Sequence, residues 1–223
     1  MSSVDQKLLR IGVFFDGNFF HRVNMYYRYS HLIRQWISIP GLHEFIRHHV
    51  AHAEGIDVRF AHIVDSHFFR GRIWAREADA RQLLYPERVF DDVLMAAGVV
   101  THYLPVTTRK KGIDVWLALE AFELALYKRF NVLVLIAGDG DFVPLARKVN
   151  SLGARMMILG WDVKYTDGNG QEQEIGTSAR LLNEVTYPVM MQTVIDGKFR
   201  QKAVLITNMF SEPRNPTNDS RTS

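Results

Sequence analysis

Two aspartates separated by one glycine are the residues of this chain best placed to do chemistry. Asp139 and Asp141 belong to the run GDGDF at residues 138–142, which follows an apolar stretch at residues 132–137. Two neighbouring carboxylates repel each other, and a divalent cation or a shared proton relieves that repulsion. Hard oxygen donors without histidine or cysteine suit Mg²⁺ or Mn²⁺. The pair therefore predicts a catalytic site that uses one of these metals.

Two further aspartates occupy comparable positions elsewhere in the chain. Asp16 follows a short apolar run and precedes Asn18, and Asp114 stands at the start of an apolar helical pattern. Any one of the four acids has roughly even odds of being a simple helix cap or turn residue. Capping needs one acceptor per helix, so four acids at one edge of a sheet are better explained as a shared metal and catalytic site.

The elements that must position these acids alternate along the chain. Apolar runs predict buried strands, and periodic patterns predict helices between them. The predicted strands cover residues 11–15, 56–64, 99–106, 132–137 and 154–159, with a short edge strand within 184–191; the predicted helices cover 42–52, 87–97, 113–130, 143–149 and 178–183. This alternation predicts an α/β fold whose mostly parallel sheet is covered on both faces. Ligands bind at the carboxyl ends of such strands, where the four acids would meet.

Basic residues near the acids indicate the charge of the substrate. Arg70 and Arg72 fall in an arginine-rich connection predicted at 66–84, and Lys110 and Lys111 precede Asp114. Basic side chains around a carboxylate site suit a polyanion, although solvated surface arginines are the commoner explanation of any one of them. The aromatic and basic segment 68–74 is interpreted as stacking bases and holding phosphates, with a strand end carrying core aromatics as the alternative.

Composition limits the class of protein. The 223 residues are 47% hydrophobic and 23% charged with a net charge of +3, which is ordinary for a globular domain. The absence of cysteine excludes disulfides, zinc–thiolate sites and cysteine nucleophiles. No stretch is apolar enough to span a membrane and the N-terminus lacks a signal-peptide pattern, so we expect no membrane partner and a cytoplasmic location.

Three acidic motifs occur in an order that resembles a known family. The runs FDGNF at 15–19, KGIDV at 111–115 and AGDGDFVPL at 137–145 resemble the NYN domain family, a branch of the PIN-like nucleases. The similarity covers roughly residues 10–190 and includes SARLL at 178–182. It implies a Rossmann-like, PIN-type three-layer sandwich and Mg²⁺- or Mn²⁺-dependent endonuclease cleavage of mainly single-stranded RNA. The family's acidic site falls on Asp16, Asp114, Asp139 and Asp141.

The resemblance also sets the expected contacts and boundaries. RNA is the expected partner, and the residues expected to contact it are Asn18, Arg70, Arg72, Lys110, Lys111 and Ser178. The nuclease domain is placed at residues 8–195 and a C-terminal extension at 196–223, of which 211–223 has the polar, proline-containing composition of a disordered tail. The sequence leaves the oligomeric state open, including a homo-oligomer.

Two other functions remain as alternatives at this stage. A module of the same fold could bind RNA or a regulatory protein partner with little catalysis. A dehalogenase-type phosphohydrolase would need an Asp-x-Asp pair after the first strand, and Asn18 stands where the second acid is required. We rank that third reading last.

Overall fold

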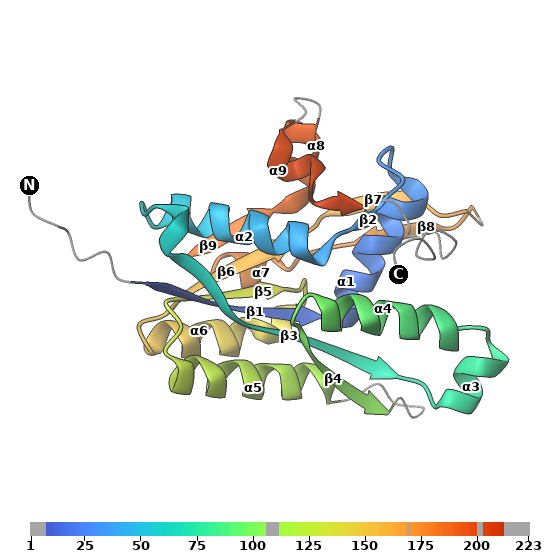
Figure 1. Ribbon diagram of the computed structural model, residues 1–223, viewed down its shortest axis with the longest axis horizontal. Helices are drawn as coiled ribbons and strands as arrows, with labels where there is room; N and C mark the ends of the chain where they lie inside the picture. Colours follow the sequence, from blue (N-terminus) through green and yellow to red (C-terminus); the bar gives the residue numbers. More distant parts are fainter. Residues whose placement is uncertain (1–7, 106–111, 169, 200–202, 212–223) are drawn as a thin grey trace, which may run out of the picture.

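A parallel sheet forms the centre of the molecule. The computed structural model describes residues 8–105, 112–168, 170–199 and 203–211. Within them, six strands form one sheet in the order β4–β3–β1–β5–β6–β9, and every neighbouring pair is parallel (Figure 1). The strands are β1 (Leu9–Asp16), β3 (Ala61–Arg72), β4 (Val100–Pro105), β5 (Val132–Ile136), β6 (Arg155–Gly160) and β9 (Tyr187–Met190). The predicted α/β fold with a mostly parallel sheet is confirmed.

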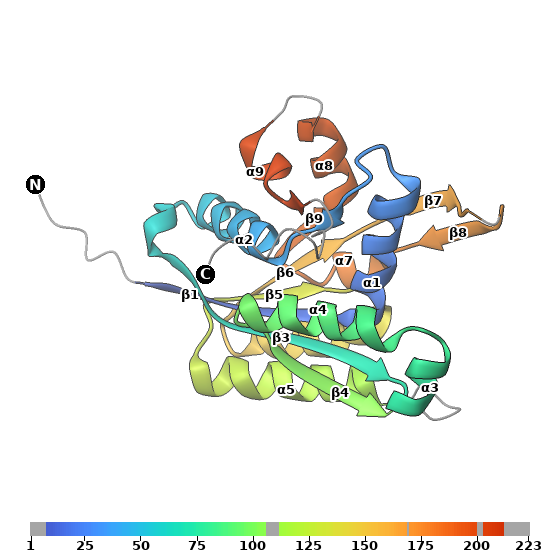
Figure 2. The same cartoon turned by 45° about the vertical axis from the view of Figure 1, so that its right-hand side comes forward.

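Helices cover both faces of this sheet and give the sandwich its three layers (Figure 2). One buried cluster lies under α1 (Gly17–Met25), α2 (Ile39–Ala53) and α4 (Leu84–Ala96). The other lies under α5 (Ile113–Lys128), α6 (Val143–Ser151) and α7 (Ala179–Leu182). All five residues of β5 are buried because the strand is sandwiched between the two clusters, and this explains its uninterrupted apolar sequence.

The strand order reverses direction at β1. The chain runs from β1 outward through β3 to β4, and then crosses back to place β5 on the other side of β1. Such a switch point leaves a binding position at the carboxyl ends of the two central strands. Phe15 is in register with Ile136, the last residue of β5. Asp16 and the turn after β5 therefore emerge side by side.

The second strand of the sheet differs from the prediction. A strand was expected at 56–64, but β3 begins at Ala61 and continues to Arg72, through the first part of the segment expected to be a connection. Phe68 and Phe69 are fully buried, so the prediction that they stack bases is wrong. They occupy opposite clusters, because alternate residues of a strand face opposite sides of a sheet.

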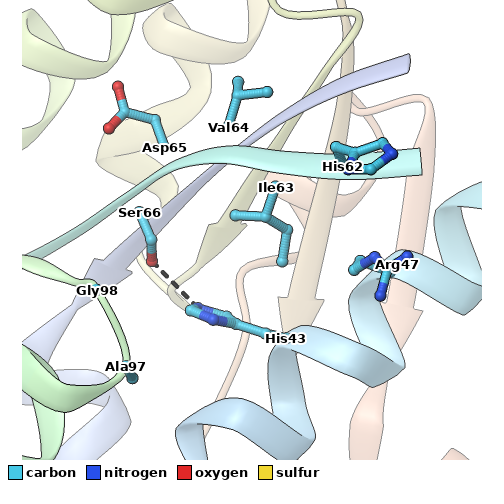
Figure 3. Close-up of a pocket in the computed structure, with 9 residues that line it drawn as sticks. All are labelled: His43, Arg47, His62, Ile63, Val64, Asp65, Ser66, Ala97 and Gly98. Atoms are coloured by element: carbon cyan, nitrogen blue, oxygen red, sulfur yellow. Dashed lines mark hydrogen bonds between the residues drawn. The ribbon is translucent and has the colours of Figure 1, made fainter. Parts of the chain in front are cut away.

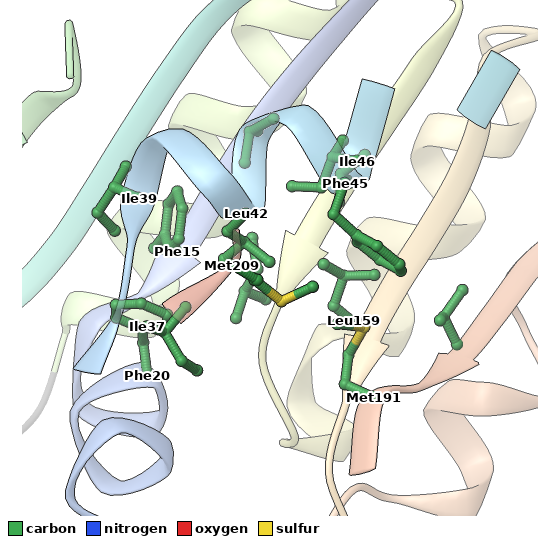
Figure 4. Packing of buried hydrophobic residues seen from close by; sticks show 14 of the residues in the cluster. Phe15, Phe20, Ile37, Ile39, Leu42, Phe45, Ile46, Leu159, Met191 and Met209 are labelled. Carbon is green, nitrogen blue, oxygen red and sulfur yellow. The ribbon is translucent and has the colours of Figure 1, made fainter. Parts of the chain in front are cut away.

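The C-terminal part of the described chain packs against its N-terminal third. It contains α8 (Met191–Phe199), α9 (Val204–Thr207) and β10 (Phe210–Ser211), and β10 pairs antiparallel with β2 (Trp36–Ile37). Met209 is fully buried with the side chains of α2 (Figure 4). The packed domain thus extends beyond the boundary predicted at residue 195. Of the predicted disordered tail, residues 212–223 lie outside the described residues, and Ser211 ends β10.

Smaller elements complete the description. A π-helix, η1 (Tyr26–Ser30), follows α1, and two short 3₁₀-helices are η2 (Val58–Phe60) and η3 (Gly140–Phe142). The helix α3 (Ala75–Ala80) follows β3, and a hairpin is formed by β7 (Val163–Thr166) and β8 (Glu172–Ile175). No helix in the described part of the chain has the length and apolar character needed to cross a bilayer.

Candidate functional site

Asp16 ends β1 and caps α1. Its Oδ1 accepts hydrogen bonds from the backbone amides of Asn18 at 3.0 Å and Phe19 at 3.2 Å. These bonds fix the orientation of the carboxylate at the helix start. Burial and the negative charges of Asp114 and Asp139 raise the pKa of Asp16 to about 6, against the lowering effect of the two amides. The surroundings of Asp16 therefore disfavour the ionised form of its carboxyl group.

The GDGDF turn follows β5 and is tightly packed. Asp139 accepts a hydrogen bond from the backbone amide of Asp141 at 2.9 Å and so caps η3. A Cβ atom on Gly138 would lie 2.4 Å from the carbonyl oxygen of Gly176 and 2.5 Å from the ring of Phe19. Only glycine fits there without a shift of the backbone. The turn is consequently wedged between α1 and the segment that precedes α7.

Asp114 reaches the same edge of the sheet from the first turn of α5. Gly112, with φ of +116°, precedes that helix in a conformation that favours glycine. Burial raises the pKa of Asp114, and the charges of Asp139 and Asp141 raise it as well. The charge of Asp139 acts on both Asp16 and Asp114, and that of Asp141 acts on Asp114, so the acids lie near one another at this edge of the sheet.

The acids suit a divalent cation by charge and donor type. Carboxylates that raise one another's pKa gain from a bound positive charge, and Mg²⁺ and Mn²⁺ prefer such oxygen donors. Among the described residues, however, no three acidic, histidine or cysteine side chains are arranged as ready ligands of one metal ion. The match is thus one of donor chemistry and charge, without a preformed coordination shell.

Ser178 and Asn18 also lie at this edge. The backbone amide of Ser178 donates to the carbonyl oxygen of Gly138 at 2.8 Å, and a Cβ on Gly140 would meet the Ser178 hydroxyl oxygen at 2.8 Å. Ser178 therefore touches the acidic turn. Asn18 follows the capping residue Asp16 at the start of α1, and it is exposed.

The four basic residues named from the sequence have different surroundings. Arg72 forms ion pairs with Asp91 at 2.6 Å and Glu87 at 3.7 Å, and its guanidinium lies 4.6 Å from the ring centre of Tyr103. These partners neutralise its charge, which favours a structural role over the expected contact with substrate. Arg70 is partly exposed on β3. Lys110 and Lys111 lie outside the described residues.

His21 lies on α1 near Arg70 and was not among the residues selected from the sequence. Desolvation and the positive charge of Arg70 together lower the pKa of His21 to about 4. This effect places Arg70 near the first turns of α1, the helix that Asp16 caps. No local pattern could have signalled this approach, because His21 comes from α1 and Arg70 from β3.

A pocket of about 540 Å³ lies away from the acids, between α2, β3 and the end of α4 (Figure 3). Its His43 Nε2 lies 3.1 Å from the hydroxyl oxygen of Ser66. Burial lowers the pKa of His43 to about 4, so the imidazole is neutral near pH 7 and can accept a hydrogen bond from the hydroxyl. Arg47 in the same pocket binds the carbonyl oxygens of Ala61 and Val58 and the carboxylate of Glu44. The polar groups of this pocket serve the packing of α2 on β3.

The sheet with acids at its switch point defines an α/β domain of the PIN-like type. The family model described as NYN domain matches residues 10–184, and the chain therefore belongs to the NYN domain family. This membership implies a nuclease-like function related to RNA. It confirms the resemblance drawn from the three acidic motifs.

One solved structure shares the fold. It is the crystal structure of a protein of unknown function from Vibrio parahaemolyticus, which is 19% identical, with a TM-score of 0.50. The match covers 86% of this chain and 96% of the Vibrio chain. At this identity the similarity concerns the fold alone. No curated protein matches the chain.

Proposed function

We propose that this NYN domain is a metal-dependent endoribonuclease that hydrolyses phosphodiester bonds in mainly single-stranded RNA. The observation that carries the proposal is the crowding of carboxylates at the switch point of the sheet: burial and the charges of Asp114 and Asp139 raise the pKa of Asp16, and burial and the charges of Asp139 and Asp141 raise that of Asp114. A folded protein gains no stability from such crowding of like charges. The arrangement is explained if the acids bind a cation that takes part in the reaction.

The four aspartates are the residues that would hold Mg²⁺ or Mn²⁺. When bound, such a cation supplies charge neutralisation at the phosphate and lowers the pKa of water. The chain itself contributes orientation: the capping bonds of Asp16 and Asp139 fix two of the carboxylates before substrate arrives. Glycine is required at position 17 for close packing, because a Cβ there would lie 2.6 Å from both the Phe68 ring and the carbonyl oxygen of Phe69.

The substrate would be positioned by groups around the acids. Arg70 supplies a positive charge beside α1, and Ser178 supplies a hydroxyl against the acidic turn. We include Lys110 and Lys111 because they precede Asp114 in the sequence. A polyanion gains from this basic surround, and a single strand presents its phosphates without the constraint of a duplex.

The test is cleavage of a labelled single-stranded RNA in Mn²⁺ or Mg²⁺. The Asp139→Asn variant should lose at least roughly 100-fold in rate, because it removes a charge that the reaction requires and keeps the shape of the side chain. The Asp92→Asn variant is the matched control, since Asp92 is an exposed acid on α4. Equal rates for wild type and Asp139→Asn would contradict the proposal.

A circular RNA distinguishes the mode of cleavage. An endonuclease converts the circle to linear products, whereas an exonuclease leaves it intact. The same preparation tests the alternative of an RNA-binding module. Such a module would bind RNA in EDTA with unchanged affinity, and it would not cleave the RNA whichever metal is added.

A further inference from the structure

The longest part of the chain without aspartate or glutamate is residues 17–43, and it carries three arginines. These are Arg22, Arg28 and Arg34, and none of them forms an ion pair with any residue that the structure describes. Two of them donate instead to uncharged carbonyl oxygens, Arg28 to that of Arg34 at 2.6 Å and Arg34 to that of Tyr29. Hydrogen bonds of this kind fix the guanidinium groups in place and leave their positive charges unneutralised.

The segment that follows α1 is anchored by its buried side. Ile33 and Ile37 belong to the cluster under α2, and the backbone amide of Ile37 donates to the side-chain oxygen of the buried Asn24 at 2.8 Å. His31 Nε2 lies 3.1 Å from a carboxylate oxygen of Asp196. The other side of the segment is exposed or half-exposed. We name its side chains the η1 surface: Arg28, Tyr29, Leu32, Arg34 and Trp36.

Aromatic rings and a guanidinium group are neighbours on the η1 surface. The ring centres of Tyr29 and Trp36 are 6.0 Å apart, and their planes are nearly perpendicular, at 87°. The guanidinium carbon of Arg28 lies 5.7 Å from the ring centre of Tyr29 and 6.0 Å from that of Trp36. Tyr29 is 53% exposed, so part of its ring is open to a flat ligand. The η1 surface thus combines positive charge with an accessible aromatic ring.

Single-stranded RNA has the chemistry that fits this combination. Its phosphates are attracted to unneutralised arginines, and its unpaired bases stack on exposed aromatic rings. A duplex keeps its bases stacked inside and offers its phosphates alone. A lipid surface takes up inserted apolar side chains, and Leu32 is the one aliphatic member of the η1 surface. Charge and aromatic character together therefore favour a single strand.

The η1 surface lies at the far end of the helix that Asp16 caps. α1 continues directly into the π-helix η1, so Tyr29 lies about 20 Å from Asp16 along the helix axis. Figures 1 and 2 show α1 rising from the carboxyl ends of the central strands, with the segment after it at its outer end. A strand that reaches both places therefore runs along α1.

We propose that the η1 surface is a second RNA-binding site, which holds a single strand at a distance from the acids that cut it. The choice of ligand rests on the proposed nuclease function and extends it. The η1 surface determines how tightly a long substrate is held, and it takes no part in the reaction itself. Its loss should therefore weaken RNA binding and raise KM without changing kcat.

Fluorescence anisotropy of a labelled, unpaired RNA strand of about 16 nucleotides in EDTA measures this binding without cleavage. Tyr29→Ala should raise the dissociation constant about 10-fold, as for the loss of one stacked base. Tyr127→Ala is its matched control, since Tyr127 is 73% exposed on α5 and lies outside the η1 surface. Wild-type affinity in Tyr29→Ala, or an equal loss in Tyr127→Ala, would overturn the proposal.

The salt dependence of the same binding tests the arginines. Arg34→Gln should reduce the slope of log K against log salt concentration by about 0.7, as for one lost phosphate contact on a single strand. Arg129→Gln is its matched control, because Arg34 and Arg129 are both exposed and both have a positive φ, 54° and 50°. An unchanged slope in Arg34→Gln, or the same change in Arg129→Gln, would count against the η1 surface.

Vesicles of phosphatidylcholine and phosphatidylserine distinguish RNA from a lipid surface as the ligand. Tyr29→Ala should bind these vesicles as wild type does. If Tyr29→Ala loses vesicle binding and keeps its RNA affinity, the η1 surface contacts membranes and the proposal is wrong.

Cleavage kinetics separate this second site from the nuclease function. With the same RNA in Mn²⁺, Tyr29→Ala should raise KM about 10-fold and leave kcat unchanged, because the acids are untouched. Cleavage by wild type and Tyr29→Ala with the same KM would reject the η1 surface and leave the proposed function standing. Weaker RNA binding by Tyr29→Ala, with no cleavage by wild type, would reject the nuclease function and leave the η1 surface standing.

Discussion

The backbone amide of Ser178 donates a hydrogen bond to the carbonyl oxygen of Gly138, at 2.8 Å. This bond joins the start of α7 to the turn that carries Asp139 and Asp141. The same turn is pressed against Phe19 of α1 and the carbonyl oxygen of Gly176. The acidic turn is thus held from two sides, and its geometry depends on the packing of residues that take no part in chemistry.

Substitution of Gly138 tests this packing. Gly138→Ala should lower the free energy of unfolding by about 1–3 kcal/mol, because the new Cβ meets the carbonyl oxygen of Gly176 and the ring of Phe19. Gly168→Ala is the control, since a Cβ there has no atom within 4 Å, and its effect should stay within about 0.5 kcal/mol. Urea denaturation measures both. Equal stability of the two variants would show that the turn tolerates the added methyl group.

The raised pKa of Asp16 predicts a pH dependence of stability in metal-free protein. Folding raises this pKa from 3.8 to about 6, so between these values the folded state binds more protons than the unfolded state. The free energy of unfolding contributed by Asp16 is therefore greatest below pH 4 and falls as the pH rises to 6. Asp16→Asn lacks this loss and can still accept the capping bonds.

Denaturation in EDTA at pH 4 and pH 7 measures the difference. Between the two values, wild type should lose roughly 1–3 kcal/mol relative to Asp16→Asn. Parallel pH profiles for the two proteins would mean that Asp16 has an ordinary pKa in the folded state.

Addition of Mn²⁺ should stabilise the protein through the same acids. A ligand that binds the folded state at 100 times its dissociation constant adds about 2.7 kcal/mol. Thermal unfolding with and without Mn²⁺ should show an increase in Tm for wild type and Asp92→Asn, and a much smaller one for Asp139→Asn. A similar increase in all three would place the bound cation elsewhere on the surface.

The strands that flank the site could be predicted because their sequences are apolar throughout. β1 and β5 are buried on both faces, and local composition is enough to identify them. β3 was misplaced because its second half carries His67, Arg70 and Arg72. His67 is buried there because Nδ1 lies 2.9 Å from His102 Nε2 on β4 and its Nε2 lies 3.0 Å from an oxygen of Asp65. The partner on β4 cannot be seen in a local pattern.

The placement of the acids at one edge of the sheet was predictable for a similar reason, and the surroundings of the nearby arginines were not. Asp16 and Asp139 each follow a strand that the sequence marks clearly, and parallel strands end at one edge. The difference between Arg70 and Arg72 depends on Asp91, which comes from α4. The sequence spacing of the two arginines holds no information about that helix.

The two arginines should respond differently to substitution. Arg72→Ala should lower the free energy of unfolding by roughly 1–3 kcal/mol, because Asp91 and Glu87 lose their shared partner. Arg70→Ala should leave stability nearly unchanged and weaken RNA binding, with the salt dependence of log K reduced by about 0.7, as for one lost phosphate contact on a single strand. Binding at several salt concentrations checks this. Loss of stability in Arg70→Ala and loss of RNA binding in Arg72→Ala would mean that Arg70 has the structural role and Arg72 the RNA contact.

The C-terminal segment should be essential for stability. Met209→Ala should lower the free energy of unfolding by about 2–5 kcal/mol, because Met209 is fully buried in the cluster under α2. Val204→Ala is the control, since Val204 is exposed on the neighbouring α9. Denaturant unfolding compares them. A neutral effect of Met209→Ala would mean that the segment is an appendage of a domain that ends at residue 195.

The pairing of β10 with β2 also determines when the fold can be completed during translation. Ile37 pairs with Phe210, whose ring centre lies 5.2 Å from that of Tyr27 in the π-helix that continues α1. A nascent chain grows by roughly 5–20 residues per second, so about 10–35 s pass between the translation of β2 and that of its partner β10. Until then the segment that continues α1, the helix capped by Asp16, lacks its packing contact with Phe210. The packing that supports the proposed nuclease site is thus complete only after nearly the whole described chain has been translated.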